Sequence, residues 1–300
     1  MNSPLDQQDY QDIWYTSHDG LKLYARDYSA QQAGLSRGTI LCMPGLTRNS
    51  ADFSIVASNM SKHYRVIAVD QRGRGNSNND PNPLNYHPGC YVEDMFCLID
   101  HLQLNNIILL GTSLGGLMSL IMASIKPELF NGIILNDVGP EVDTAGLNRI
   151  QAYVGKQPVV NNWQDAIQQA QATNQQALPD LDHVAWERFT RAIYREGEEG
   201  QLELAYDPAI SLNMKVADEA SVQADLWPQF TASNKKPMLV IRGESSDILS
   251  IDCVKKMCAI HKALVFCQIP NRGHTPLLDE PESLRALKTF LANLPTANRY

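Results

Sequence analysis

One turn constrains this sequence more than any other feature. The pentapeptide Gly111-Thr112-Ser113-Leu114-Gly115 directly follows the apolar run at 107–110. A Gly-x-Ser-x-Gly segment between a strand and a helix is typical of the nucleophile elbow, a sharp turn that leaves the serine side chain exposed. Glycine has no Cβ, so the strand and the helix can approach each other closely at Gly111 and Gly115. We therefore expect Ser113 to have a strained backbone conformation at the end of a buried strand.

The residues on both sides of this turn have the periodicity that an elbow requires. The short apolar run before it is typical of a buried parallel strand. After it, apolar side chains recur at helical spacing until Pro127 ends the run. This context favours a nucleophilic serine, and the alternative is a serine in an ordinary turn between a strand and a helix.

The rest of the sequence alternates apolar strands with helical segments. We expect buried strands at 38–43, 64–70, 132–137, 237–243 and 264–269, a half-exposed edge strand at 21–28, and helices at about 91–102, 252–261 and 282–291. Strands that alternate with helices at this spacing predict a mostly parallel, doubly wound α/β sheet with helices on both faces.

The pattern changes between residues 141 and 235, where buried strands are absent and glutamine is frequent. Helical spacing dominates this segment. We therefore predict a small helical cap at 141–235, inserted into a core of residues 1–140 and 236–300. Aromatic side chains of the cap are candidates for the wall of a substrate pocket, with helix packing as the alternative. They are Trp163, Trp186, Phe189 and Tyr194.

Charge and composition exclude several classes of protein. The chain of 300 residues has a net charge of −8 and no basic cluster longer than two residues. This argues against nucleic acid and against anionic membrane surfaces as partners. The polar first ten residues do not resemble a secretory signal, and no apolar run reaches the roughly 18 residues of a membrane helix.

The cysteines indicate neither a metal site nor a disulfide framework. The six cysteines are scattered, with no zinc-type spacing to one another or to histidine. We expect reduced thiols in a cytoplasmic protein that needs no metal or cofactor. The sequence leaves the oligomeric state open.

A nucleophilic serine needs two further side chains. Its hydroxyl is a weak nucleophile at neutral pH, so a base must lie within hydrogen-bond distance, and an acid must orient that base. After an elbow of this type, the acid and then a histidine follow along the chain, each in a loop after a strand. Among the seven histidines, His274 follows the strand at 264–269, with Gly273 before it. We predict that His274 is the base, and a loop histidine without function is the alternative.

Two aspartates compete for the role of the orienting acid. Asp247 follows the strand that ends at Gly243, and Asp137 ends the strand before that one. Chain order and position at a strand end favour Asp247, with Asp137 as the alternative. For the developing oxyanion we predict two backbone N–H donors. One belongs to Leu114 at the start of a helix, and the other to Leu46 in the loop after the strand at 38–43.

These residues together resemble the α/β-hydrolase fold superfamily over nearly the whole chain. The segment at 70–77, Asp-Gln-Arg-Gly-Arg-Gly-Asn-Ser, is similar to the family's Asp-x-Arg-Gly-x-Gly-x-Ser segment. Pro44-Gly45 stands where the family usually has His-Gly, which affects the assignment of Leu46 and not the fold. The resemblance is greatest to bacterial esterases, lactonases and carbon–carbon hydrolases with a short helical cap. The resemblance implies that some branches of the family use aspartate at the elbow, and Ser113 argues against them.

We therefore predict a serine hydrolase that cleaves a small carboxylic ester or lactone. Ser113 attacks the carbonyl, His274 takes the proton and Asp247 orients the imidazole. Water then releases the acyl group from the enzyme. The alternatives are a carbon–carbon hydrolase of the same fold, and a ligand sensor that keeps the three residues but has little turnover.

Overall fold

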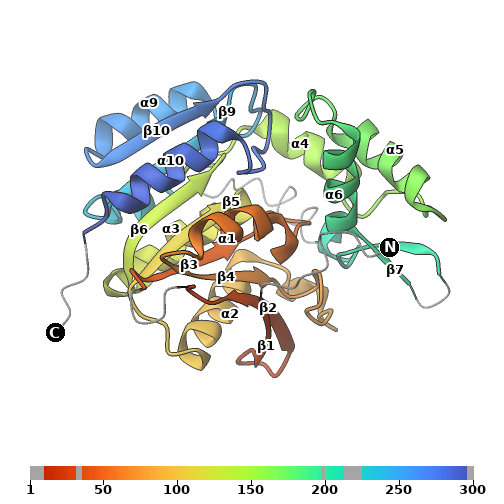
Figure 1. The fold of residues 1–300 in the computed structure, drawn as a ribbon, viewed down its shortest axis with the longest axis horizontal. Coiled ribbons are helices and arrows are strands. Elements are labelled where there is room, and N and C mark those ends of the chain that lie inside the picture. The colour runs from red at the N-terminus through yellow and green to blue at the C-terminus, as the bar shows by residue number, and fades with distance from the viewer. Residues whose placement is uncertain (1–9, 32–35, 198–199, 213–224, 296–300) are drawn as a thin grey trace.

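The computed structural model describes residues 10–31, 36–197, 200–212 and 225–295. Its main feature is an eight-stranded sheet with the order β1-β2-β4-β3-β5-β6-β9-β10 (Figure 1). Strands β4, β3, β5, β6, β9 and β10 are parallel to one another, whereas β2 runs antiparallel to both of its neighbours, β1 and β4. The predicted mostly parallel sheet is confirmed. The strands are β1 (Gln11–Thr16), β2 (Lys22–Tyr28), β3 (Thr39–Met43), β4 (Arg65–Asp70), β5 (Ile107–Thr112), β6 (Phe130–Asn136), β9 (Met238–Gly243) and β10 (Leu264–Ile269).

Helices cover both faces of the sheet because its central strands are apolar on both faces. In β3, Ile40 and Cys42 belong to one buried cluster, whereas Leu41 and Met43 belong to the other, as the alternation of side chains along a strand requires. The first cluster packs under α1 (Ser54–Met60) and α10 (Pro281–Ala292). The second packs under α2 (Pro88–His101), α3 (Leu114–Ile125), α8 (Trp227–Ala232) and α9 (Ile251–Ile260).

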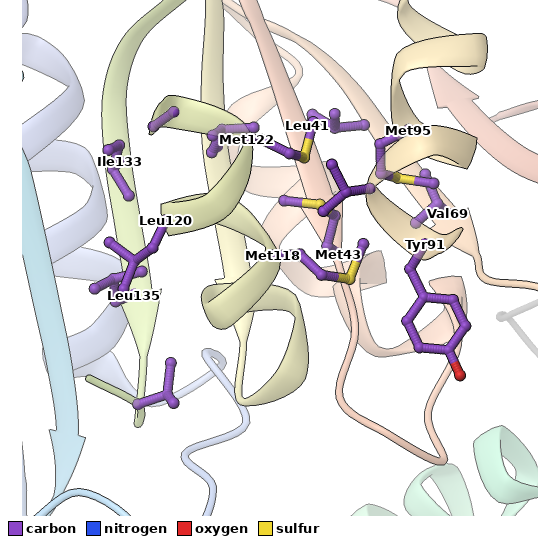
Figure 2. Close-up of a cluster of buried hydrophobic side chains, with 14 of the residues drawn as sticks. Leu41, Met43, Val69, Tyr91, Met95, Met118, Leu120, Met122, Ile133 and Leu135 are labelled. Atoms are coloured by element: carbon purple, nitrogen blue, oxygen red, sulfur yellow. The ribbon is translucent and has the colours of Figure 1, made fainter. Parts of the chain in front are cut away.

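The second cluster contains several methionines that fill the space between helices and sheet. Figure 2 shows Met118 and Met122 of α3 and Met95 of α2 against side chains of β3, β4 and β6. Each fully buried side chain of this size contributes roughly 1.5–3 kcal/mol to folding. Within the described residues, none of the helices combines the length and the apolar character needed to cross a membrane.

Strand β1 was not predicted from the sequence. Four of its six residues are exposed, and its three apolar residues, Ile13, Trp14 and Tyr15, are consecutive, so the run is short and does not alternate with polar residues. Because β1 pairs with β2, the segment at 21–28 is not the edge strand that we expected. Most residues of β2 are buried as a result.

Between residues 144 and 204, the segment predicted as a cap forms helices and one hairpin beyond one end of the sheet (Figure 1). Within it, α8 contacts α3 of the core. The predicted division into a cap at 141–235 and a core of the remaining residues stays a prediction, and residues 198–199 and 213–224 lie outside the described part. The elements are α4 (Thr144–Tyr153), α5 (Trp163–Asn174), α6 (His183–Ile193), β7 (Tyr194–Glu196) and β8 (Leu202–Leu204), and short 3₁₀ helices elsewhere are η1 (Ser50–Phe53), η2 (Pro83–Asn85) and η3 (Pro127–Leu129).

A buried arginine organises the loops that follow β4. The guanidinium of Arg72 is fully buried and forms ion pairs with Asp80 at 2.5 Å, Asp94 at 2.6 Å and Asp19 at 2.8 Å. The side chains of Asp80 and Asp94 are 3% and 1% exposed. The arginine of the segment at 70–77 thus neutralises two carboxylates that water does not reach.

We expect Arg72→Met to lower the free energy of unfolding by about 3–5 kcal/mol, because the substitution leaves buried carboxylates without a partner. Urea denaturation followed by circular dichroism measures this change. Arg285→Met is the control, since Arg285 is exposed on α10 and its loss should cost less than about 0.5 kcal/mol. Equal effects of the two substitutions would contradict the role assigned to Arg72.

Candidate active site

The turn between β5 and α3 has the strained geometry that its sequence predicts. Ser113 has φ 51° and ψ −115°, a conformation that costs roughly 1–3 kcal/mol. A Cβ added to Gly111 would lie 2.1 Å from the carbonyl oxygen of Gly115. A Cβ added to Gly115 would lie 2.1 Å from that of Met43. Both glycines are therefore required for the close approach of β5, α3 and β3 that holds the serine out of the turn.

The hydroxyl of Ser113 begins a chain of hydrogen bonds. Nε2 of His274 lies 2.9 Å from Oγ of Ser113, and Nδ1 lies 2.7 Å from Oδ2 of Asp137. A carboxylate only accepts hydrogen bonds, so Nδ1 carries the proton and Nε2 is left to accept the one from the hydroxyl. The side chains of His274 and Asp137 are 7% and 0% exposed. This arrangement can remove a proton from Ser113 and stabilise the imidazolium that results.

This geometry corrects the expectation that Asp247 orients the imidazole. Asp247 instead forms a bidentate ion pair with Arg149 of α4, at 2.5 and 2.9 Å. Desolvation alone would raise the pKa of the Asp247 carboxyl, but the hydrogen bonds and charge of Arg149 lower that pKa below its usual range. The carboxylate favoured by chain order is thus an ion-pair partner of the cap.

Asp137 reaches the imidazole because the chain turns sharply at the end of β6. Its φ of 58° directs the side chain back toward the neighbouring strands. Oδ1 accepts a hydrogen bond from the backbone N–H of Gly243 at 2.8 Å, and Oδ2 accepts one from Oγ of Ser246 at 2.7 Å. The loop after β9 therefore supplies two donors that hold the acid. The sequence did not predict this role for Gly243 and Ser246, and no local pattern distinguishes it.

The loop after β3 lies directly beside the serine. A Cβ added to Gly45 would be 3.7 Å from Cβ of Ser113. The backbone N–H groups of Leu46 and Leu114 have no hydrogen-bond acceptor among the described residues. Both predicted oxyanion donors are therefore available, and their role stays a prediction.

Arg74 holds the loop that carries Leu46. Its side chain is 1% exposed, and its Nε donates to the carbonyl oxygen of Leu46 at 2.8 Å. Its guanidinium stacks over the ring of Tyr91, 4.7 Å from the centroid. The backbone at residues 74–75 pairs with residues 205–206. The N–H of Gly75 donates to the carbonyl oxygen of Ala205 at 2.8 Å, and Arg74 forms an isolated antiparallel bridge with Tyr206.

A cavity of about 110 Å³ opens onto Ser113 and His274. Of the four aromatic candidates from the cap, Phe189 alone lines it. The sequence did not predict several other lining residues, among them Tyr153, whose pKa is raised by burial so that its hydroxyl stays protonated. Helical periodicity reveals which side of a cap helix is buried, but not whether it faces a pocket or another helix.

The other three aromatic candidates pack inside the cap and do not line this cavity. The ring of Trp186 lies edge-on to that of Phe189, with 5.6 Å between centroids. The hydroxyl of Tyr194 bonds Oε1 of Gln157 at 3.0 Å. The indole N–H of Trp163 donates to Glu196 at 3.2 Å. These three candidates therefore have the alternative role, packing within the cap, and do not form the pocket wall.

Comparisons with known proteins agree with this fold. The model of the alpha/beta hydrolase fold family matches residues 38–281. A 3-hydroxybutyrate-oligomer hydrolase from Cupriavidus necator is 30% identical over 257 residues, or 84% of this chain and 87% of the relative. A 2-(acetamidomethylene)succinate hydrolase from Mesorhizobium japonicum is 28% identical over 84% of this chain and 87% of its own length.

A solved structure extends the similarity to nearly the whole chain. It is an alpha/beta hydrolase from Novosphingobium aromaticivorans, 37% identical, with a TM-score of 0.89 over 95% of this chain and 98% of its own. The elbow, the sheet order and these matches define the class. This chain belongs to the α/β-hydrolase fold family.

Proposed function

We propose that this protein is a serine hydrolase that cleaves a carboxylic ester through an acyl-enzyme. The observation that carries the proposal is the hydrogen-bond chain from Oγ of Ser113 through His274 to Asp137, at 2.9 and 2.7 Å. A nucleophile, a base and an orienting acid in this geometry are what ester cleavage by serine requires. Asp137 takes the role that the sequence analysis gave to Asp247.

The first half of the reaction forms the acyl-enzyme. Oγ of Ser113 attacks the ester carbonyl while Nε2 of His274 takes its proton. The oxyanion that forms accepts hydrogen bonds from the backbone N–H groups of Leu46 and Leu114. When the tetrahedral intermediate collapses, the bond to the alcohol oxygen breaks and His274 returns its proton to that oxygen. The alcohol leaves, and the acyl group stays on Ser113.

The second half repeats these steps with water. His274 takes a proton from a water molecule, which attacks the acyl carbonyl, and then returns that proton to Oγ of Ser113 as the acid is released. Asp137 stabilises the imidazolium in both halves. Because Gly243 and Ser246 donate hydrogen bonds to Asp137, its side chain is fixed in orientation toward the imidazole.

The names of two relatives support a derivative of a small carboxylic acid as substrate. The Cupriavidus necator relative is named for hydrolysis of an oligomer of a hydroxy acid, and the second relative for hydrolysis of a succinate derivative. The small cavity beside Ser113 is consistent with a short acyl group. A lactone is a cyclic ester and would react by the same steps.

We expect the purified protein to hydrolyse p-nitrophenyl acetate and to lose this activity on treatment with a fluorophosphonate, which reacts with activated serines. Mass spectrometry of the digested protein should place one adduct on Ser113. The same digest of protein denatured before treatment is the control and should carry no adduct. An adduct on a different residue, or no turnover of any ester, lactone or thioester in a panel, would contradict the proposal.

A further inference from the structure

A second and much larger cavity adjoins the one at Ser113. It has a volume of about 870 Å³ and is bounded by η1 and α1, by α6 of the cap, by residues 275–279 and by the end of β2. Arg48, Thr112 and Phe189 line both cavities. The small cavity is below the roughly 150 Å³ that holds a benzene molecule, so most of a larger substrate must lie in the second cavity.

Three of the four arginines that line the large cavity are paired with carboxylates. Nε of Arg48 donates to Asp52 at 2.8 Å. Arg188 forms an ion pair with Asp279. Arg191 forms one with Glu187 at 2.9 Å, on the exposed side of α6. These three charges are already neutralised within the protein.

Arg26 of β2, the fourth arginine, has no carboxylate within ion-pair distance in the described part of the chain. Its guanidinium stacks over the ring of Tyr10, 4.6 Å from the centroid. Its Nε and the hydroxyl of Tyr28 are both buried, and the two side chains interact with each other, but neither atom has a well-aligned hydrogen-bond partner among the described residues. Asp70 also acts on Arg26 through space, but its oxygens accept backbone N–H bonds from Ser50 and Asn76.

A planar guanidinium held by stacking leaves its N–H edges in position for a carboxylate, which it binds with two parallel hydrogen bonds. No carboxylate of the described residues provides that partner. The wall of the large cavity at β2 therefore has the chemistry of a carboxylate site.

The sheet register gives the separation between this site and the serine. Arg26 pairs with Ala68, Ala68 with Cys42, and Cys42 with Leu110, so Arg26 lies three strands away from β5. Three strand spacings and the three residues from Leu110 to Ser113 place the two Cα atoms roughly 17 Å apart. A molecule that reaches both sites is extended and carries its charge far from the reacting carbonyl.

We propose that Arg26 binds a terminal carboxylate of the substrate, and that the substrate class is short linear oligoesters of hydroxy acids. This inference rests on the proposed function. In such an oligoester the free carboxylate belongs to the fragment that leaves as the alcohol. The small cavity then holds the hydroxyacyl unit attached to Ser113, and the large cavity holds the leaving fragment, with its carboxylate at Arg26.

The test compares oligomers of 3-hydroxybutyrate, from dimer to tetramer, as free acids and as methyl esters of the terminal carboxylate. The unaltered protein should prefer the free trimer and tetramer over their methyl esters. Arg26→Gln should lower kcat/KM for those free acids by about tenfold to a hundredfold, the loss expected for a hydrogen-bonded charge. It should leave kcat/KM for p-nitrophenyl acetate and for the methyl esters within about twofold. Arg26→Lys should restore part of the preference.

Lys22→Gln is the matched control, because Lys22 carries the same charge on the same strand but is exposed and does not line the large cavity, and its kcat/KM values should not change. Equal cleavage of free acids and methyl esters by the unaltered protein would overturn the carboxylate site, independently of any variant. So would an equal loss of all activities in Arg26→Gln. If the unaltered protein cleaves p-nitrophenyl acetate but no oligomer, the substrate class is wrong and the proposed function stands. If it cleaves neither, the proposed function itself fails.

Discussion

Replacing Ser113 with alanine should lower kcat for ester hydrolysis by roughly 10⁴–10⁶-fold, since the remaining groups can stabilise the oxyanion but cannot form the acyl-enzyme. Alanine keeps the Cβ of serine and removes only the hydroxyl, so the close backbone contacts at Gly111 and Gly115 are unchanged. Initial rates with p-nitrophenyl acetate, at protein concentrations high enough to detect the residual activity, measure the effect.

Ser124→Ala is the control for this substitution. Ser124 lies on the same helix, α3, and its hydroxyl bonds the carbonyl oxygen of Ile121. Its loss should leave kcat unchanged and cost less than about 1.5 kcal/mol of stability. Undiminished turnover in Ser113→Ala would show that the hydrolysis takes place by a different route.

Asp137→Asn should lower kcat by about 10⁴-fold. An asparagine amide at this position donates to Nδ1 of His274, so the ring proton moves to Nε2 and the imidazole can no longer accept the proton of Ser113. Asp247→Asn should change kcat by less than about tenfold. Its ion pair with Arg149 is one-third exposed, and such pairs contribute about 0–1 kcal/mol. Steady-state kinetics of the two variants side by side measure the difference.

The two substitutions are matched in chemistry and in position at a strand end. A collapse of activity in Asp247→Asn, with activity retained in Asp137→Asn, would mean that His274 changes its partner during the reaction. Circular dichroism of both variants distinguishes a loss of activity from a loss of folding.

The sequence predicts the serine and the histidine because their positions depend on local constraints. The elbow demands glycine on both sides of Ser113, and the position of His274 follows from the strand before it. The contact between these two residues is present in the structure. Their catalytic roles remain a proposal.

The choice between the two aspartates depends on non-local geometry, and the sequence analysis favoured the wrong contact. Asp137 and Asp247 follow β6 and β9, which are neighbours in the sheet. Both also lie between Ser113 and His274 in the chain, so the chain order that we used to favour Asp247 is satisfied by either residue. The choice rests on the turn at Asp137 and on a hydroxyl from Ser246, a residue of the loop in which Asp247 lies. Strand β1 was missed for a related reason, since its short apolar run has no clear period and its pairing with β2 defines it as a strand.

The pairing of the segment at 73–75 with residues 205–207 has a consequence for protein engineering. The backbone N–H of Asp207 donates to the carbonyl oxygen of Gly73 at 2.8 Å, and Nε of Arg74 donates to the carbonyl oxygen of Leu46. A cap taken from another hydrolase would lack this backbone pairing. The loop after β3, which carries Leu46 beside Ser113, would then lose its support, even if Ser113, His274 and Asp137 were kept. Chimeras with an exchanged cap should therefore keep residues 205–207 together with Arg74.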